Sequence, residues 1–582
     1  MAGSLRRRDV GTTVTLGGWV HRSRDLGGLV FIDLRDRDGL VQVSFNPEWT
    51  PAEVIAAAAA VGVESVVLVE GVVAERPAEM RNRDLGTGEI EVRAKGLTVV
   101  GPATTPAIPV APAKDGKLAA EELRLRHRVL DLRRPELARN LELRHRLMRV
   151  TRGYLSDEGC LEIETPILTK PTPEGARDFL VPSRMHPGEF FALPQSPQIY
   201  KQLFMCCGFD RYFQIARCFR DEDLRADRQL EFTQIDIEAS FVTREDILVL
   251  AEGLIEALWH EGGAAVERPF PRMTYAEAME RFGCDRPDLR YGLEIADLTP
   301  VFGRSESAII QQAMAAGGRV RGLRVPGGAA WSRKQVDDLE AIAKKAGAGG
   351  LVRLKRGEGK LEGPLAKFLD DDAQRALGLA DGELLLAVAG ADAVSNPALD
   401  RVRQECAARL GLFDDAERRF LWVLDFPMFA RDAATGALAA VHHPFTSPDP
   451  ADMAAHPDAP ERWRALAYDC VLNGTELGGG SIRTSDPAVQ ARMFALLGIA
   501  DRAEQERRFG FLLEGLRAGA PPHGGIAFGF DRIAMLLAGA DSLRDVIAFP
   551  KTTAARALFE GAPTRVPEDD LVELHIRTTE HA

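Results

Sequence analysis

Five short segments near the N-terminus set the strongest limit on how this chain can fold. Each alternates apolar and polar residues, and glycines punctuate the region that holds them: Val14–Val20, Leu29–Leu34, Leu40–Phe45, Ser65–Val73 and Glu89–Val100. Such alternation is typical of strands that bury one face, and a helical, alanine-rich patch lies between the third and fourth segments. Five short strands with one helix predict a small barrel of the oligonucleotide-binding type.

The chain has 582 residues, so several domains are expected, because single cores stop growing well below that length. A stretch rich in proline and alanine, Thr104 to Lys114, is typical of a linker. Beyond about residue 289 the composition changes to alanine and glycine, without a chemical motif, which favours an inserted α/β module that splits a larger domain. The expected boundaries are 1–106 for the barrel, 107–140 for a hinge, 141–288 and 416–555 for the split domain, 289–415 for the insertion and 556–582 for a C-terminal extension.

The net charge and the cysteines limit the partners and the cellular compartment that can be expected. A formal net charge of −13 argues against a nucleic-acid partner by its sum, but arginines cluster at 6–8, at Arg22 and Arg24, and between 124 and 149. Seven cysteines without CxxC spacing fit a reducing compartment better than a disulfide framework or a zinc site. No apolar run approaches the ~18 residues of a membrane helix, so we expect a cytoplasmic protein with no membrane contact.

The segment from Arg217 to Glu238 holds the densest chemistry, reading RCFRDEDLRADRQLEFTQIDIE. Its first half, rich in arginine and carboxylates, is compatible with a salt-bridged hairpin. In the second half Gln234, Asp236 and Glu238 alternate with apolar residues and therefore share one face of a predicted strand. A buried face lined by an amide and two carboxylates is costly unless it binds something polar or cationic, which favours a ligand site.

Two carboxylates flank a turn in the later segment YDCVLNGTELGGGSIR. Asp469 precedes the turn at Asn473 and Gly474, Glu476 follows it, and the triple glycine that comes next lets backbone approach a ligand closely. Two carboxylates with an arginine nearby suit a Mg²⁺ ion that bridges polyphosphate oxygens, because this ion keeps several waters and needs few protein ligands. The alternative is a glycine-rich hairpin with surface acids.

Two further regions give weaker signals. In APPHGGIAFGFDRI, Arg532 falls near a predicted helix start, where anions are favoured and a guanidinium can clamp a phosphate. The loop TKPTPEGARDFL is followed by LPQSPQIYK, in which Gln198 and Lys201 share a helix face. His442 and His443 are adjacent, and such a pair is more often structural than catalytic.

In this order, the segments resemble the signature motifs of class II aminoacyl-tRNA synthetases. The words TPEGARDFLVPSR, ALPQSPQ, FRDEDLRADRQ, FTQIDIE, HHPFTSP, GGGSIR and GFDR resemble the bacterial aspartyl branch of that class. The resemblance covers nearly the whole chain and is weakest between about 290 and 415. It implies an α+β fold, with the barrel ahead of a catalytic domain (141–288 and 416–555) built on an antiparallel sheet of six or seven strands. It also implies that ATP and Mg²⁺ are used to join L-aspartate to tRNA(Asp) through an aspartyl-adenylate.

The resemblance carries roles onto the motif residues. Arg220 would bridge the amino-acid carboxylate and the α-phosphate, and Arg532 would hold the γ-phosphate, so these two are the expected catalytic residues. No general base is needed, because the task is to position two anions and neutralise their charge. Asp469 and Glu476 would hold Mg²⁺. The other expected ATP contacts are Asp221, Glu222, Gln229, Phe232, Gly529, Phe530 and Asp531, with Phe232 stacked on adenine.

An aspartate pocket is implied in the same way. Lys201 and Arg483 would grip the side-chain carboxylate with help from His442. Asparagine would leave these two cations unpaired, which would allow discrimination by roughly 10⁴ or more. Glu174, Gln198 and Asp236 would supply acceptors for the substrate's ammonium group. Gln234 and Ser196 would complete the pocket.

In the barrel, the resemblance implies that anticodon bases are unstacked and read. Phe31 would supply the stacking face, Gln42 and Glu91 would hydrogen-bond to base edges, and Arg22 and Arg24 would meet phosphates.

Several positions refine these expectations. Leu26 stands where relaxed enzymes that also charge tRNA(Asn) often carry histidine, so we expect the discriminating form. Leu230 replaces the family's usual proline, and Ser44 replaces one member of the barrel's usual aromatic pair. The segment 141–166 resembles the family's dimer interface, which implies a homodimer.

Three alternatives remain open. An asparaginyl-tRNA synthetase would not need two cations around the substrate side chain. A non-catalytic relative should have lost at least one of Arg220, Glu476 and Arg532, and all three are present. An asparagine synthetase of the same class resembles only the catalytic half, so the intact barrel counts against it.

Overall fold

The computed structural model describes residues 1–111, 117–171, 175–222, 228–303, 305–432 and 434–579. The chain forms two compact units, each assembled from segments that are distant in the sequence. The first consists of Met1–Arg146, Asp223–Leu230 and Ala534–Ala582, and the second of Leu147–Glu222 and Glu231–Ile533. None of the described helices is both long and apolar enough to cross a membrane.

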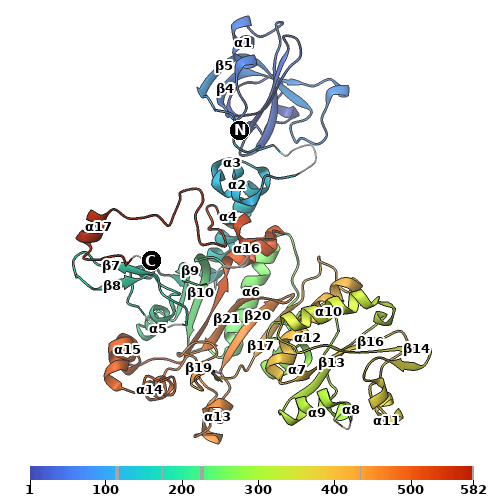
Figure 1. Ribbon diagram of the computed structural model, residues 1–582. Coiled ribbons are helices and arrows are strands. Elements are labelled where there is room, and N and C mark those ends of the chain that lie inside the picture. The colour runs from blue at the N-terminus through green and yellow to red at the C-terminus, as the bar shows by residue number, and fades with distance from the viewer. Residues whose placement is uncertain (112–116, 172–174, 223–227, 304, 433, 580–582) are drawn as a thin grey trace. The chain divides into compact units, whose positions relative to one another are not determined.

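The N-terminal strands close into a five-stranded barrel, which confirms the predicted fold (Figure 1). The strand order is β1-β2-β3-β5-β4, with bounds β1 Thr13–Asp25, β2 Val30–Asp36, β3 Gly39–Phe45, β4 Val66–Glu75 and β5 Ile90–Gly101. Helix α1 (Ala52–Ala60) contributes to the same apolar core. Ile32 and Val43 point inward and are fully buried, so their neighbours Phe31 and Gln42 face outward.

Arginines tie the rest of the first unit together. The helices here are α2 (Glu121–Arg126), α3 (Arg128–Asp131), the start of α4 (Pro135–Asp157) and, near the C-terminus, α17 (Glu568–Glu573). Arg128 is buried and donates hydrogen bonds to the carbonyl oxygens of Arg544, Ile547 and Ala548. Arg133 pairs with Glu64 of the barrel at 2.9 Å, so the hinge segment is bonded to the barrel.

The second unit is built on an eight-stranded sheet in the order β11-β17-β20-β21-β22-β10-β9-β6. The strands are β6 Leu161–Glu162, β9 Arg211–Phe219, β10 Glu231–Ser240, β11 Arg272–Thr274, β17 Phe420–Leu424, β20 Ala467–Leu472, β21 Thr475–Ile482 and β22 His523–Gly529. The six central strands are antiparallel, and the short edge strands β11 and β6 pair in parallel. The predicted antiparallel sheet is therefore confirmed, with a short parallel strand added at each edge.

Helices pack on this sheet and orient the strands' polar residues. Helix α6 (Arg244–Glu261) begins at a capping box formed by Thr243 and Asp246, and it packs against β22. Helix α5 (Gln198–Cys206) contacts β10 and β9. It is held by an apolar cluster with helices α14 (Pro487–Leu496) and α15 (Arg502–Arg517). This packing brings the polar positions of α5 to the polar face of β10.

In the sequence, between β11 and β17 of the large sheet, the chain forms a second sheet in the order β12-β13-β16-β14-β15. Its strands are β12 Ala296–Asp297, β13 Arg319–Val325, β14 Val352–Gly357, β15 Lys360–Glu362 and β16 Leu384–Gly390. The accompanying helices are α8 Thr299–Phe302, α9 Ala308–Ala315, α10 Arg333–Lys345, α11 Asp371–Ala376 and α12 Asp392–Leu410. Alternate residues of β16 enter two separate apolar clusters, so both faces of this sheet are covered. We call this element the inserted module; helix α7 (Tyr275–Phe282) precedes it.

Candidate active site

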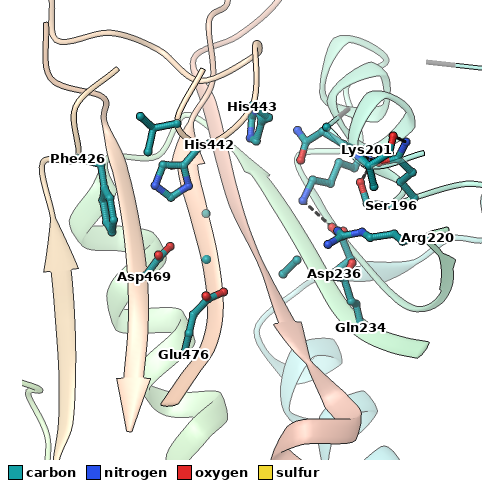
Figure 2. A pocket seen from close by; sticks show the side chains of 18 of the residues that line it. Ser196, Lys201, Arg220, Gln234, Asp236, Phe426, His442, His443, Asp469 and Glu476 are labelled. Carbon is teal, nitrogen blue, oxygen red and sulfur yellow. Dashed lines mark hydrogen bonds and ion pairs between the residues drawn. The ribbon is translucent and has the colours of Figure 1, made fainter. Parts of the chain in front are cut away.

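A cavity of about 480 Å³ lies over the central sheet of the second unit and gathers most of the predicted catalytic-domain residues. Figure 2 shows Lys201, Ser196 and Arg220 on one side, with Asp469 and Glu476 facing them from neighbouring strands. The predicted residues on its wall are Ser196, Gln198, Lys201, Arg220, Glu222, Gln234, Asp236, His442, Asp469, Glu476 and Arg483. Glu174 lies outside the described residues. The wall also includes Gln195, Asp285, Phe426 and His443, which the sequence analysis did not assign.

Lys201 and Arg483 converge on one carboxylate. Lys201 Nζ lies 2.6 Å from Asp236 Oδ1 and 3.2 Å from Glu238 Oε2. The Arg483 guanidinium binds both Glu238 oxygens, at 2.9 and 3.1 Å. All four side chains are at most 3% exposed. Asp236 and Glu238 are two residues apart on β10, so strand geometry places both carboxylates beside α5 and the end of β21.

Burial sets the protonation of this cluster. Burial raises the pKa of Asp236, and the nearby Lys201 cation offsets this only in part. Burial would also raise the pKa of Glu238, but Arg483 and Lys201 outweigh it and hold that pKa below its ordinary value. Each cation therefore already has a carboxylate partner before any substrate binds. The expectation that asparagine would leave these two cations unpaired is therefore corrected, because both are already paired with carboxylates.

Four polar atoms of cavity residues are buried and have no hydrogen-bond partner among the described residues: Gln198 Nε2, Arg220 Nε, Asp236 Oδ2 and His442 Nε2. Leaving such an atom unpaired costs roughly 1–3 kcal/mol. A site that tolerates this cost at four atoms is prepared for a polar ligand. The carboxylate oxygen of Asp236 is suited to an ammonium group, and the N–H groups of Arg220 and Gln198 are suited to carboxylate or phosphate oxygens.

Both histidines of the HHP sequence reach the cavity. Burial and the Arg483 cation lower the pKa of His442 to about 4, so its ring is neutral at neutral pH. The same two causes hold the pKa of His443 well below its usual range. His443 Nε2 lies 2.6 Å from Arg483 Nη1, and because arginine can only donate, this nitrogen accepts. From the sequence, only His442 was expected to help bind the substrate, since adjacent histidines give no signal of which ring meets the arginine.

On the opposite wall, Asp469 of β20 and Glu476 of β21 are placed across their shared hairpin. A Cβ atom at Gly479 would lie 2.3 Å from Asp469 Oδ1, so glycine is required there for the carboxylate to lie over the strand. Burial raises the pKa of Asp469 well above its ordinary value, and Glu476 and Asp285 raise it further. No group of three or more His, Cys, Asp or Glu side chains with metal-holding geometry occurs in the part of the chain that the structure describes. Two carboxylates still fit Mg²⁺, which keeps several waters, and a cation would relieve their repulsion.

The predicted phosphate and adenine residues lie close to this cavity. The Arg220 guanidinium carbon lies 5.1 Å from the centre of the Phe232 ring. Arg532, in the first turn of α16 (Phe530–Ala538), donates to the carbonyl oxygen of Glu476. The Asp221 backbone donates to the carbonyl oxygen of Arg177.

Three other predicted ATP residues have structural partners or are buried. Asp531 accepts a hydrogen bond from the Thr233 backbone at 2.8 Å, which ties α16 to β10. Phe530 is fully buried, so only its backbone and that of Gly529 could meet a ligand. In the first unit, the amide of Gln229 donates to the carbonyl oxygen of Lys551 and accepts from its backbone N–H.

The barrel carries a second cavity, of about 390 Å³, in the first unit. Its wall includes the predicted Arg22, Arg24 and Gln42. Arg24 pairs with Asp33 at 2.9 Å, and Gln42 donates to Glu91 at 3.4 Å. Leu26 is 66% exposed. Phe31 lies opposite the buried Ser44 on the adjacent strand.

Four polar residues of this groove were not predicted from the sequence: His21, Asp33, Arg76 and Asn82. Arg76 is buried, its Nε atom has no hydrogen-bond partner among the described residues, and burial lowers its pKa. A buried guanidinium in a groove favours an anionic or acceptor-rich ligand. In the sequence, the signal that pointed to Arg76 was its position just after the fourth barrel strand.

Comparison with known proteins matches both parts of the chain. Residues 14–100 match the OB-fold nucleic acid binding domain, and residues 120–553 match the tRNA synthetases class II (D, K and N). Among solved structures, the asparaginyl-tRNA synthetase of Pyrococcus horikoshii complexed with asparaginyl-adenylate aligns with a TM-score of 0.59 at 21% identity. That alignment covers 94% of this chain and 96% of the other, and it shows the fold alone.

Sequence relatives are much closer. The aspartate–tRNA(Asp/Asn) ligase of Caldanaerobacter subterraneus subsp. tengcongensis is 50% identical over 582 residues, covering 99% of this chain and 98% of that protein. The aspartate–tRNA ligase of Geobacillus kaustophilus is also 50% identical, over 580 residues, with 99% and 98% covered. With this identity over its whole length, the chain belongs to the bacterial aspartate–tRNA ligases, class II aminoacyl-tRNA synthetases that use ATP to join aspartate to tRNA.

Proposed function

We propose that the cavity over the central sheet activates L-aspartate as aspartyl-adenylate before transfer to tRNA(Asp). The observation that carries the proposal is the convergence of Lys201 and Arg483 on Glu238. Beside it lies Asp236 Oδ2, which has no hydrogen-bond partner among the residues that the structure describes. Cations at one end and an ammonium acceptor nearby match the two ends of aspartate. The spare N–H groups of Lys201 and Arg483 can donate to both oxygens of a carboxylate. An amide would turn its NH₂ group toward one of these donors, and the resulting mismatch disfavours asparagine.

In this proposal, the bound aspartate presents its α-carboxylate to Arg220. An oxygen of that carboxylate forms a bond to the α-phosphorus of ATP, and the bond to pyrophosphate breaks. Arg220 neutralises the two anions as they meet, and Arg532 holds the γ-phosphate, so positioning and charge neutralisation lower the barrier. Asp469 and Glu476 hold Mg²⁺, which when bound neutralises phosphate charge. Gln198, Gln234 and Ser196 orient the amino acid, while Glu222 and Phe232 contact the nucleotide.

The proposal extends to the transfer RNA. The barrel groove binds the anticodon, with Phe31 stacking on a base, Gln42, Glu91 and Arg24 beside it, and Arg22 at the backbone. Leu26 favours the discriminating form, which charges tRNA(Asp) and not tRNA(Asn). The curated relatives include proteins named for either specificity, so the choice rests on Leu26 of this chain.

Assembly and location complete the proposal. Exposed apolar side chains lie in the segment expected at the dimer interface and just after it: Leu161, Ile167 and Leu168 are each more than 40% exposed. Covering them in a second copy would stabilise a homodimer, because apolar surface removed from water is worth about 25 cal/mol per Å². A cytoplasmic setting fits the free cysteines among the described residues.

The experiment is a charging assay with purified tRNA(Asp) and tRNA(Asn), each with aspartate and with asparagine. The proposal expects aspartate on tRNA(Asp) alone. Aspartate on both transfer RNAs would reject only the discriminating form, and asparagine on either would reject the substrate assignment.

A further inference from the structure

The inserted module is fixed to the catalytic domain by two buried arginines. Arg321 of β13 donates to the carbonyl oxygens of Met279 and Glu280 at the end of α7. Arg403 of α12 donates to the carbonyl oxygens of three residues in the loop that follows α7: Asp288 at 2.8 Å, Tyr291 at 2.9 Å and Leu293 at 2.8 Å. Both guanidinium groups are fully buried. Arg403 therefore holds residues 283–293, the segment that joins α7 of the catalytic domain to the inserted module, and we call this segment the clamp loop.

Arg403 holds the clamp loop with a buried charge that carbonyl oxygens and aromatic rings balance, which is an unusual arrangement. Among the described residues it forms no ion pair with a carboxylate, and its charge is met by carbonyl oxygens and by the rings of Phe282 and Tyr291, at 4.7 and 4.3 Å. Burial lowers its pKa. A buried cation is expensive to keep, whereas an apolar residue could fill the same volume. Its donors fix three carbonyl groups of the clamp loop at once, and this constrains the loop's path more than apolar packing would.

The clamp loop reaches the active-site cavity. Its neighbour is the turn between β20 and β21, where a Cβ atom at Gly474 would lie 3.5 Å from Asp288 Cβ and 3.8 Å from the carbonyl oxygen of Arg286. Asp285 of the loop lines the cavity together with Asp469 and Glu476. It lies close enough for its charge to act on Asp469. The inserted module thus holds the loop that brings a third carboxylate to the wall where the proposed metal site lies.

The cavity that this wall bounds is a ligand site on independent grounds, given by atoms on its other side. Asp236 Oδ2 and Gln198 Nε2 belong to side chains that are 1% and 7% exposed, and both atoms lack a partner among the described residues of the same cavity. The described residues hold no group of three or more His, Cys, Asp or Glu side chains placed to coordinate a metal ion directly. Mg²⁺ keeps several of its waters in proteins, and a carboxylate just beyond its ligands orients them by accepting their hydrogen bonds.

We propose that Asp285 is a further residue of the nucleotide side of the active site, accepting hydrogen bonds from water on the ATP-bound Mg²⁺, and that Arg403 is its positioning residue. This inference rests on the proposed function. It assigns the inserted module a part in adenylate formation: the module holds the loop that supplies this acceptor.

The first test measures Asp285→Asn by calorimetric binding of ATP with Mg²⁺, without aspartate, and by the Mg²⁺ dependence of ATP–pyrophosphate exchange. Loss of such an outer acceptor should weaken Mg²⁺–ATP binding about tenfold, while the KM for aspartate is unchanged. Asp338→Asn, an exposed carboxylate on α10, is the matched control and should behave as wild type. Equal Mg²⁺–ATP affinity for Asp285→Asn and wild type would overturn the proposal.

The second test asks whether Arg403 acts through Asp285. Arg403→Met should also weaken Mg²⁺–ATP binding, and adding Asp285→Asn should give little further loss, because both changes remove the same acceptor. Arg321→Met removes the other buried arginine and should lower the melting temperature without changing Mg²⁺–ATP affinity. If the fold-losses of Mg²⁺–ATP affinity from the Arg403 and Asp285 changes instead multiply in the double variant, the positioning role of Arg403 is rejected. If Arg403→Met does not fold, the Asp285→Asn result alone decides, and a wild-type chain without aspartate-dependent exchange would instead reject the proposed function.

Discussion

Lys201 and Arg483 bind the same carboxylate: the Glu238 side chain lies 3.2 Å from Lys201 Nζ and 2.9 Å from Arg483 Nε. One residue of α5 and one that follows β21 are thereby fixed relative to β10 before any substrate arrives. Neutralised in this way, the two cations can be buried together without the repulsion they would otherwise exert. In the proposed pocket, the substrate would meet donors that are already oriented, which would reduce the entropy lost on binding.

Changing Glu238 to Gln should disable the pocket and destabilise the fold. Two buried cations would lose a shared partner, and breaking a buried pair in this way costs about 3–5 kcal/mol. We expect a lower melting temperature and a much higher KM for aspartate in pyrophosphate exchange. Glu231 lies on the same strand as Glu238, and Glu231→Gln serves as the control. It breaks only the exposed pair with Arg217 and should cost about 1 kcal/mol or less. A Glu238→Gln protein with normal KM and stability would show that the shared carboxylate is dispensable.

His442 should make stability depend on pH in a defined window. Its pKa is about 4 in the folded chain against an ordinary value of 6.5, so between these values the unfolded chain binds more protons. Its contribution to the free energy of unfolding is therefore complete above pH 6.5 and is lost as pH falls toward 4. Urea titrations at several pH values should show a shallower slope across this window for His442→Gln than for wild type. An identical slope would mean that the ring titrates normally.

Arg532→Ala should lower ATP–pyrophosphate exchange by about 10²–10³, the range seen when one preorganised donor to a charged transition state is removed. Binding of tRNA, measured by filter retention, should be nearly unchanged. Arg507→Ala, an exposed arginine of α15, serves as the control and should affect neither. Equal loss of exchange and tRNA binding for Arg532→Ala would give this residue a structural role through the Glu476 carbonyl oxygen.

Phe31→Ala should have the opposite effect to Arg532→Ala: it should weaken tRNA binding and leave pyrophosphate exchange unchanged. Losing one base stack should cost about 1–3 kcal/mol of tRNA binding, with exchange of pyrophosphate unaffected. Phe241→Ala removes a phenylalanine that is 75% exposed in the other unit and provides the control. Charging that is indifferent to the Phe31 change would reject the anticodon assignment.

Much of this architecture could be predicted from the sequence, for physical reasons that also explain the gaps. The barrel strands could be predicted because each buries one face, on which residues such as Ile32 and Val43 lie. Strand β16 reads as the apolar run LLLAVAG because both of its faces are buried, so it showed no period, and the inserted module's topology could not be derived.

The site was predicted where residues lie close in the sequence and missed where the fold brings distant parts together. Periodicity placed Asp236 and Glu238 on one strand face, but it could not show that Lys201 and Arg483 would both bind Glu238. Asp285 was missed because its position depends on a loop held by Arg403, far along the chain.

The measurement closest to the main proposal is ATP–pyrophosphate exchange by the intact chain with aspartate or asparagine as the only amino acid. Donors prepared for a carboxylate should support exchange with aspartate and reject asparagine by a factor on the order of 10⁴ in kcat/KM. Comparable exchange with asparagine, or none with aspartate, would show that Lys201, Arg483 and Glu238 do not form an aspartate pocket.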